Sequence, residues 1–188
     1  MSESKAEMFN RKAAKPKYKA DKILEALSIK PGQYIADIGS GGGYYTFRFA
    51  ELVGSKGKIY AVDVNAEFLD YIKKQAQEKG LENIVTVYME DDKIDLLKHK
   101  LDYIFMRNVC HHIPKREGFF KQLKEFLKPN GKVVIVEYDG RGFFSFQKIF
   151  KHYVPKEILE QEMKDAGYKE YESFDFLTEQ SFTIYISS

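Results

Sequence analysis

Apolar residues occur along the chain in two alternating patterns, and the alternation predicts strands separated by helices. Short, nearly continuous apolar runs are typical of strands that are buried on both faces of a sheet. Such runs lie at residues 35–38, 58–64, 83–89, 101–106 and 132–138. Apolar side chains at helical spacing lie at residues 17–27, 46–53, 66–79 and 115–128. This order predicts a parallel sheet whose strands are joined by right-handed helical crossovers.

The C-terminal part of the chain has a different pattern. Residues 156–166 predict a helix that is closed by Gly167, and two predicted strands follow at 168–177 and 182–187. Only a short connector separates these two strands, whereas a parallel pair needs a long crossover. We therefore expect the two strands to pair as an antiparallel hairpin.

The length and composition fit one domain with a short N-terminal extension. A chain of 188 residues with 44% hydrophobic residues can fill a single core, which we place at residues 17–188. Residues 1–22 contain seven basic and three acidic residues, and the chain as a whole carries a net charge of +2. We expect residues 1–16 to be a flexible basic arm, and this charge does not predict a nucleic-acid partner.

A glycine-rich segment follows the first predicted strand. The sequence Y-I-A-D-I-G-S-G-G-G-Y runs from Tyr34 to Tyr44 and leads into the helix predicted at 46–53. Glycines allow a sharp turn and a close approach of the backbone to a ligand, and the free N–H groups of a helix start can meet its polar groups. Asp63 ends the next predicted strand, and a carboxylate at about this distance after a glycine turn can accept hydrogen bonds from both ribose hydroxyls. The pattern predicts a site for an adenosine-containing ligand.

Two residues argue against a dinucleotide as that ligand. The dinucleotide fingerprint has glycine at its sixth position, where this chain has the bulky Tyr44. Asp37 lies inside an otherwise apolar strand, where a carboxylate needs a polar partner. The ammonium group of a ligand would be such a partner.

These residues resemble the first motif of the class I S-adenosylmethionine-dependent methyltransferases, and in particular the group that includes the ubiquinone and menaquinone C-methyltransferases. The resemblance extends to R-N-V-C-H-H-I-P after the fourth predicted strand and to L-K-P-N-G before the fifth. It implies a Rossmann-like, doubly wound α/β fold with a seven-stranded, mostly parallel sheet and an antiparallel C-terminal strand. It also implies S-adenosylmethionine as the cofactor, S-adenosylhomocysteine as its product, and cofactor contacts at Asp37, Gly39, Gly41, Gly43, Asp63, Val64, Glu90, Asp91, Asp92 and Asn108.

Within that set the implied roles differ. The first acid and the glycines would hold the methionine part, Asp63 the ribose, and one of Glu90, Asp91 and Asp92 the adenine amino group. The sequence leaves open which of the three does so.

The candidate catalytic residues are His112 and, second to it, His111. An imidazole can accept a proton near neutral pH, and both residues follow the fourth predicted strand. A base is needed only if the acceptor must lose a proton, and a histidine here can instead pack or cap the next helix. We expect no metal, because Cys110, His111 and His112 are contiguous and lack the separated spacing of zinc ligands. Cys110 is not expected to act as a nucleophile, because methyl transfer needs no covalent intermediate with the enzyme.

The methyl acceptor is predicted to be a small molecule. The chain lacks the N/D-P-P-Y/F motif of relatives that methylate planar nitrogens, and its one cysteine cannot form the site of arsenic-methylating relatives. Phe143, Phe144, Phe146 and Phe150 would line an acceptor pocket or pack as a lid, and Glu137 would face the acceptor or cap its strand.

The remaining expectations concern location and alternative functions. No segment approaches the roughly 20 apolar residues needed to cross a bilayer, and no signal peptide is visible. We therefore expect a cytoplasmic protein. We also expect it to be a monomer or a homodimer. Two alternatives are open: a non-catalytic S-adenosylmethionine-binding protein and an NAD-dependent oxidoreductase.

Overall fold

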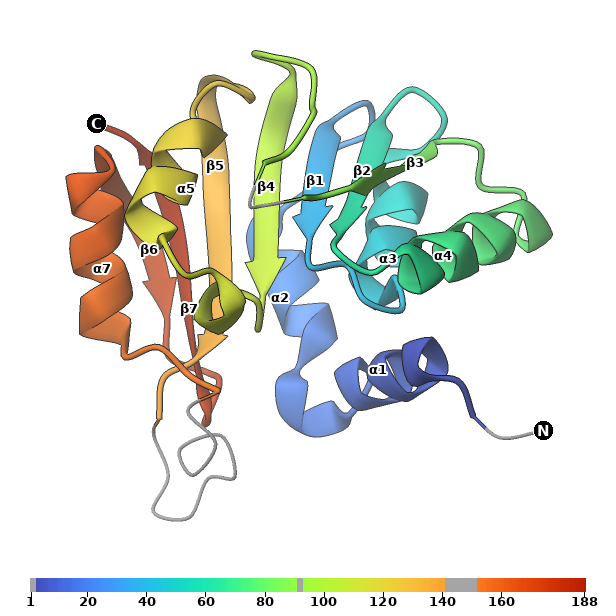
Figure 1. Cartoon of the computed structure of the whole chain (residues 1–188), viewed down its shortest axis with the longest axis horizontal. Coiled ribbons are helices and arrows are strands. Elements are labelled where there is room, and N and C mark those ends of the chain that lie inside the picture. The colour runs from blue at the N-terminus through green and yellow to red at the C-terminus, as the bar shows by residue number, and fades with distance from the viewer. Residues whose placement is uncertain (1–2, 91–92, 141–151) are drawn as a thin grey trace. The chain divides into compact units, whose positions relative to one another are not determined.

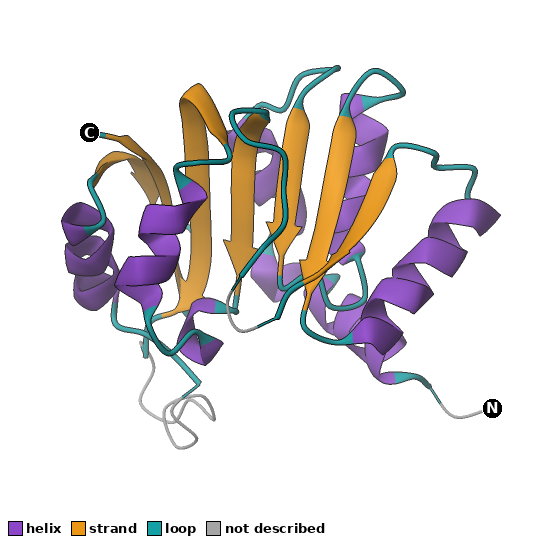
Figure 2. Cartoon of the chain, turned by 45° about the horizontal axis from the view of Figure 1, so that its top comes forward, coloured by secondary structure: helices purple, strands orange, loops and turns teal. Residues whose placement is uncertain are grey.

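The computed structural model describes residues 3–90, 93–140 and 152–188. It divides into two compact units, Met1–Asp95 and Leu96–Ser188. Strands and helices alternate along much of the chain, and its last two strands follow each other directly (Figure 2). In the described part of the chain, no helix combines the length and the apolar character that crossing a membrane requires.

The first unit contains three parallel strands in the order β3-β2-β1 (Figure 1). These are β1 (Tyr34–Ile38), β2 (Lys58–Asp63) and β3 (Ile84–Tyr88). Helix α3 (Tyr44–Val53) connects the first two strands, α4 (Ala66–Glu78) connects the second and third, and α2 (Ala20–Leu27) precedes them. β1 and β2 are almost entirely buried, which is why both read as apolar runs in the sequence.

The N-terminal residues differ from the prediction. The expected flexible arm instead contains helix α1 (Lys5–Ala13) and the 3₁₀ turn η1 (Pro16–Tyr18). Ser4 caps α1, because its hydroxyl accepts a hydrogen bond from the backbone of Glu7 while the Glu7 carboxylate accepts one from the backbone of Ser4. The basic composition of residues 1–16 indicated a solvent-exposed arm, and the capping box was not recognised in the sequence.

The second unit contains four strands in the order β4-β5-β7-β6. These are β4 (Leu101–Arg107), β5 (Leu127–Tyr138), β6 (Tyr168–Phe174) and β7 (Gln180–Ser187), with the 3₁₀ turn η2 (Cys110–His112) and helices α5 (Arg116–Leu123) and α7 (Lys156–Asp165) between them. β4 and β5 are parallel, and β7 is antiparallel to both β5 and β6. The predicted C-terminal hairpin and the mostly parallel, seven-stranded α/β fold class are confirmed.

The helix predicted at residues 115–128 is too long. α5 ends at Leu123, and Leu127 already pairs with Leu101 of β4. The Phe126 carbonyl oxygen accepts hydrogen bonds from the backbone of Lys100 and Leu101, so the chain must leave the helix before this point. Asn130 has a φ of 65°, a left-handed conformation that asparagine adopts more readily than most residues with a side chain.

Asn83 fastens the end of α3 to the start of β3. Its side-chain nitrogen donates hydrogen bonds to the carbonyl oxygens of Ala50 at 2.8 Å and Gly54 at 2.9 Å, and the residue is only 8% exposed. Each carbonyl also accepts a backbone N–H, from Gly54 at Ala50 and from Gly57 at Gly54, so Asn83 supplies a second, buried donor to both. Asn83 therefore fixes the position of the helix that follows the glycine loop.

We expect Asn83→Ala to destabilise the protein by about 1–3 kcal/mol, because two buried side-chain hydrogen bonds, each worth roughly 0.5–1.5 kcal/mol, would be lost. Urea unfolding followed by far-UV circular dichroism measures this change. Glu82→Ala, at the neighbouring exposed position, is the control and should unfold at the wild-type midpoint. Equal midpoints for both variants would show that Asn83 does not hold the helix end.

Candidate functional site

The loop between β1 and α3 is a turn held by three backbone hydrogen bonds. The N–H groups of Gly39 and Ser40 donate to the carbonyl oxygen of Val62 in β2, and the N–H of Gly43 donates to Ser40. Gly39, Gly41 and Gly43 have φ values of 72°, 52° and 83°, a region that residues with a side chain rarely adopt. The glycines at these positions are therefore required by the shape of the turn itself.

Asp63 connects this loop to the end of β2. Its Oδ2 accepts a hydrogen bond from the backbone N–H of Gly41 at 2.8 Å, and its Oδ1 accepts one from the N–H of Asn65 at 3.0 Å. The residue is 7% exposed. Each carboxylate oxygen can accept more than one hydrogen bond, so both can still receive a ligand hydroxyl. The structure brings Asp63 and the glycine loop into direct contact, as their predicted roles require.

Asp37 has a partner inside the protein. The hydroxyl of Thr46, in the first turns of α3, donates to Asp37 Oδ2 at 2.6 Å, and both side chains are buried. The burial of this carboxylate does not by itself require a ligand ammonium group. Thr46 was not identified from the sequence, although its position just after the glycines could have indicated a polar role next to the loop.

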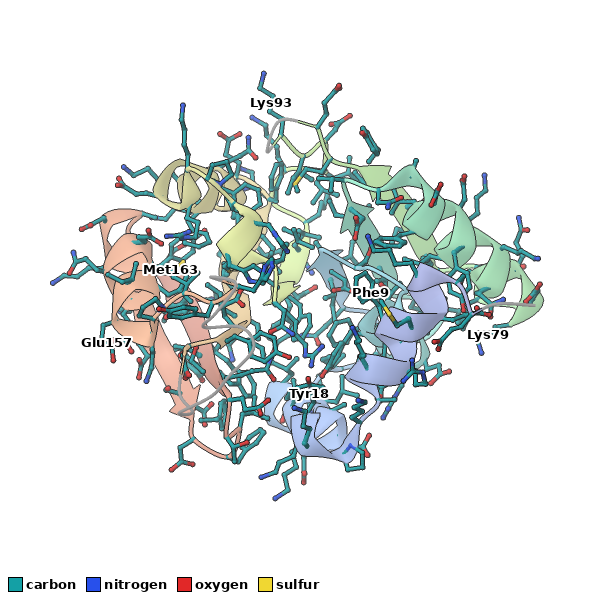
Figure 3. The ribbon with its side chains drawn as sticks, turned by 60° about the horizontal axis from the view of Figure 1, so that its bottom comes forward. Phe9, Tyr18, Lys79, Lys93, Glu157 and Met163 are labelled. Carbon is teal, nitrogen blue, oxygen red and sulfur yellow. The ribbon has the colours of Figure 1, made fainter. Side chains whose placement is uncertain are left out.

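Helix α1 packs directly on the glycine loop (Figures 1 and 3). Asn10 donates from Nδ2 to the carbonyl oxygen of Gly42 at 2.7 Å, and a Cβ atom on Gly42 would collide with Ala6 and Asn10. Phe9, labelled in Figure 3, lies against Gly41 and packs edge-on against Phe68 of α4 with ring centroids 5.5 Å apart. The residues expected to form a free arm thus belong to the surroundings of the loop.

Two polar atoms near the loop are buried without a hydrogen-bond partner among the described residues. They are Ser40 Oγ and Asn10 Oδ1. A buried polar atom without a partner is costly, so such atoms are candidates for contact with a bound ligand. Neither residue was selected from the sequence, because serine and asparagine are common in loops and helices without any ligand.

The predicted adenine-binding residues are described only in part. Glu90 is exposed and forms an isolated antiparallel bridge with Lys93, and Val64 is 58% exposed beside Asp63. Asp91 and Asp92 lie outside the described residues, as do Phe143, Phe144, Phe146 and Phe150 of the expected acceptor pocket or lid. The choice among Glu90, Asp91 and Asp92 stays open.

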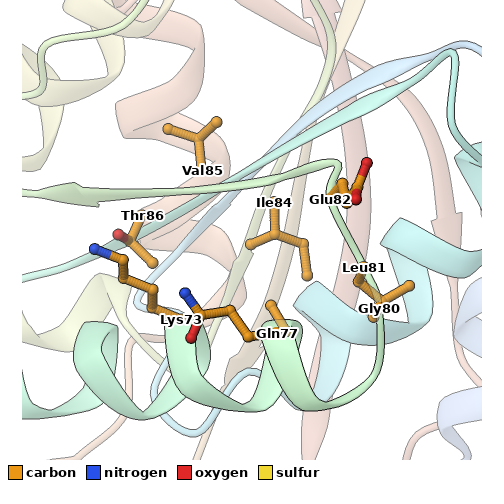
Figure 4. A pocket seen from close by; sticks show the side chains of 9 residues that line it. Lys73, Gln77, Gly80, Leu81, Glu82, Ile84, Val85 and Thr86 are labelled. Carbon is orange, nitrogen blue, oxygen red and sulfur yellow. The ribbon is translucent and has the colours of Figure 1, made fainter.

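A separate hollow of about 540 Å³ lies in the first unit, between the C-terminal half of α4 and the start of β3 (Figure 4). Lys73 and Gln77 of the helix face Ile84 and Thr86 of the strand. Ile84 pairs with Ile59 near the start of β2. This is the end of the strands opposite to the glycine loop. In open α/β sheets ligands bind outside the carboxyl ends of the strands, so we do not assign the predicted site to this hollow.

In the second unit, the fully buried carboxylate of Glu137 organises the turn that carries the two predicted catalytic histidines. Glu137 Oε2 accepts from the backbone N–H of Cys110 at 2.8 Å, and Oε1 accepts from the N–H of Tyr138 at 3.0 Å. Nδ1 of His111 lies 2.9 Å from Glu137 Oε1. Glu137 therefore accepts hydrogen bonds from the start of η2 and orients His111, whereas it was expected to cap its own strand or to face the acceptor.

The two neighbouring histidines lie together, and a third histidine joins them. The rings of His111 and His112 have centroids 4.1 Å apart, and the ring of His152 lies 5.3 Å from the first and 5.6 Å from the second. The pKa of His112 is lowered because lost solvation and the two neighbouring imidazoles disfavour its charged form. A neutral imidazole is the form that accepts a proton. His152 was missed, because it is 40 residues away from His112 in the sequence and only the fold brings them together.

Asn108 and Cys110 precede the two adjacent histidines in the sequence. The side-chain oxygen of Asn108, which has a φ of 54°, accepts a hydrogen bond from Gln180 of β7 at 2.6 Å. Cys110 is completely buried, and burial together with the nearby Glu137 raises the pKa of its thiol well above the ordinary value. A protonated, buried thiol agrees with the expectation that Cys110 is not a nucleophile.

Comparison with known proteins identifies similar sequences and folds. A family model described as a methyltransferase domain matches residues 29–180. The ubiquinone/menaquinone biosynthesis C-methyltransferase of Shewanella sp. (strain W3-18-1) is 24% identical over 157 residues, which are 83% of this chain and 62% of that protein. The chain therefore spans less than two thirds of the length of such relatives.

Solved structures share the fold. A SAM-dependent methyltransferase from Aquifex aeolicus has a TM-score of 0.84 at 23% identity, with 96% of this chain and 98% of that chain covered. A phosphoethanolamine N-methyltransferase from Haemonchus contortus, solved with phosphomonomethylethanolamine and S-adenosylhomocysteine, has a TM-score of 0.70 at 18% identity, with 89% of this chain and 51% of that chain covered. The predicted Rossmann-like methyltransferase fold is confirmed.

We expect Gly42→Ala to displace α1 from the glycine loop, because the new methyl group would occupy the space of the Ala6 carbonyl and the Asn10 side chain. Hydrogen–deuterium exchange at residues 5–13 should become faster. Gly118→Ala is the matched control, since a Cβ atom there meets no atom within 4 Å. Unchanged exchange in Gly42→Ala would contradict the packing of α1 on the loop.

We also expect the native protein not to react with a thiol reagent at pH 8. The Cys110 thiol is both shielded and held in its protonated form, whereas unfolding exposes it and restores an ordinary pKa. Absorbance with Ellman's reagent should rise only when urea is added, by one thiol per chain. Rapid modification of the native protein would show that Cys110 is accessible.

Proposed function

The chain belongs to the methyltransferase domain family, and we propose that it transfers a methyl group from S-adenosylmethionine to a small-molecule acceptor. The observation that carries the proposal is the hydrogen bond between Asp63 and the N–H of Gly41, which joins the two predicted halves of a cofactor site. A glycine turn with three left-handed residues and a carboxylate at the end of the neighbouring strand is a suitable surface for an adenosyl group.

The described residues fit such a ligand. Gly39, Gly41 and Gly43 give the turn the left-handed backbone it needs, and Ser40 Oγ is a buried polar atom that has no hydrogen-bond partner within the described parts of the protein. We assign the ribose hydroxyls to Asp63 and the methionine part to the turn and Asp37. These roles are supported by the loop contacts and by the family resemblance.

S-adenosylmethionine supplies a methyl group on a sulfonium, which an acceptor displaces in line. The task of the protein in such a reaction is to hold donor and acceptor aligned and to exclude water. The loop, fixed by Asp63 and covered by α1, fulfils the holding part of that task. Where the acceptor must lose a proton, His112 is our first candidate for the base and His111 the second, because the lowered pKa of His112 favours its neutral, proton-accepting form.

The acceptor is proposed only as a chemical class. The relatives with ubiquinone and menaquinone biosynthesis in their names methylate carbon, and the Haemonchus contortus protein carries a small phosphorylated amine. Both are small molecules, which agrees with the sequence-based exclusion of planar nucleic-acid nitrogens. The atom that receives the methyl group is not assigned.

Two measurements test the proposal. Isothermal titration with S-adenosylhomocysteine should show binding to one site per chain, and titration with NADH should show none. Incubation with S-adenosylmethionine labelled in its methyl group, together with a cell extract depleted of macromolecules, should move the label into a small molecule. Binding without any transfer would favour the non-catalytic alternative, and binding of NADH alone would favour an oxidoreductase.

We expect Asp63→Ala to weaken binding of S-adenosylhomocysteine by roughly 1.5–3 kcal/mol, since hydrogen bonds between a charged group and the ribose would be lost. Titration calorimetry gives this difference directly. Asp70→Ala removes the same charge from an exposed position of α4 and should bind as the wild type does. Equal affinity in Asp63→Ala and Asp70→Ala would remove Asp63 from the cofactor site.

A further inference from the structure

The three histidines at the end of β4 form a compact group of potential metal ligands. His111, His112 and His152 each offer a ring nitrogen, and these nitrogens all lie within 4.8 Å of one another. They are three of the four histidines in the chain. Imidazole nitrogens are the preferred ligands of Zn²⁺, Ni²⁺, Co²⁺ and Cu²⁺, whereas Mg²⁺ and Ca²⁺ prefer oxygen ligands.

Glu137 gives this group the support that metal-binding histidines usually have. Its Oε1 already accepts a hydrogen bond from the backbone of Tyr138, and its Oε2 accepts one from Cys110. An oxygen that acts as an acceptor favours the His111 tautomer in which Nδ1 carries the proton and donates to it across 2.9 Å. The lone pair of His111 then lies on Nε2, on the other side of the ring. A carboxylate–histidine pair of this kind orients a ligand and increases its basicity.

One side of the histidine cluster is buried in the protein, and the other side is exposed to solvent. Glu137 is fully buried and the side chain of His111 is 7% exposed, whereas His112 and His152 are exposed. A histidine that serves only to pack or to satisfy a buried acid needs no further imidazoles beside it. A shared ion would account for two exposed rings beside a third, buried one. Three protein ligands leave a coordination position for water or another small ligand.

We propose that His111, His112 and His152 form a binding site for a divalent transition-metal ion of the Zn²⁺ type, with Glu137 as the carboxylate that orients His111. The sequence argued against a metal because contiguous residues lack the spacing of separated ligands. That argument did not include His152. The proposed ion site uses no contact with S-adenosylmethionine. An ion bound to His112 and His111 would occupy the lone pairs that a base needs, so metal binding and the base role of these histidines exclude each other.

The first experiment measures the ion directly. Protein without a histidine tag is treated with a chelator, dialysed and titrated with Zn²⁺ by calorimetry, and bound metal is counted by mass spectrometry. We expect one ion per chain. Titration with Co²⁺ should produce visible absorption bands whose intensity reports a coordination number of four or five. No binding above the level of an unrelated protein, or absence of the Co²⁺ bands, would overturn the proposal.

The second experiment uses matched histidine variants. His112→Ala and His152→Ala change exposed side chains, so both should fold normally and lose the Co²⁺ bands. His99→Ala is the control, because His99 is the remaining histidine, and its Nδ1 lies 3.4 Å from the carbonyl oxygen of Leu127, in another part of the unit. It should keep wild-type binding. Equal binding in His152→Ala and the wild type, or loss of binding in His99→Ala, would contradict the proposed ligand set.

The third experiment tests Glu137 as a positioning residue. Glu137→Gln should lower the affinity for Zn²⁺ by about 10–100-fold while the Co²⁺ spectrum keeps its shape, because the three ligands remain. His111→Ala should instead change the spectrum. Circular dichroism and the melting temperature without metal establish that each variant is folded, and Zn²⁺ should raise the melting temperature of the wild type but not of His152→Ala. An unchanged affinity in folded Glu137→Gln would refute the role of the carboxylate.

Discussion

The structure of the proposed cofactor site depends on one interaction, the acceptance of two backbone N–H groups by the carboxylate of Asp63. One of these N–H groups belongs to Gly41 in the loop after β1, and the other belongs to Asn65 at the start of α4. A single side chain at the end of β2 thus fixes the segments that follow two neighbouring strands. The buried charge is compensated by these two donors, and its remaining lone pairs are available to a ligand.

Helix α1 adds a second constraint on the same loop. Gly42 has no room for a Cβ atom, since Ala6 and Asn10 occupy that space, and Asn10 donates to the Gly42 carbonyl. The glycines therefore have two different causes: Gly39, Gly41 and Gly43 need left-handed backbone, whereas Gly42 is set by the contact with α1. Such a contact allows the N-terminal residues to influence access to the loop without being part of the sheet.

Most strands could be predicted from the sequence because their apolar pattern reflects burial on both sides, and the partly buried β3 was also predicted from its apolar run. β1, β2, β4 and β5 were found in this way, and the glycine loop and Asp63 were found from their spacing. Failures came from interactions that composition does not reveal. The capping box at Ser4 makes a helix of residues that look like a charged arm, and pairing of Leu127 with Leu101 ends α5 earlier than its apolar stripe suggests. His152 could not be associated with His111 and His112, because only the fold brings residues so far apart into contact.

The central claim is that the glycine loop and Asp63 together receive the adenosyl part of S-adenosylmethionine. The most direct measurement is a nuclear magnetic resonance titration of ¹⁵N-labelled protein with S-adenosylhomocysteine. We predict that the largest shifts of backbone amide signals occur at Gly39, Ser40, Gly41 and Asn65, with smaller shifts in α1. Shifts confined to the hollow between α4 and β3, or no shifts at saturating ligand, would contradict the account.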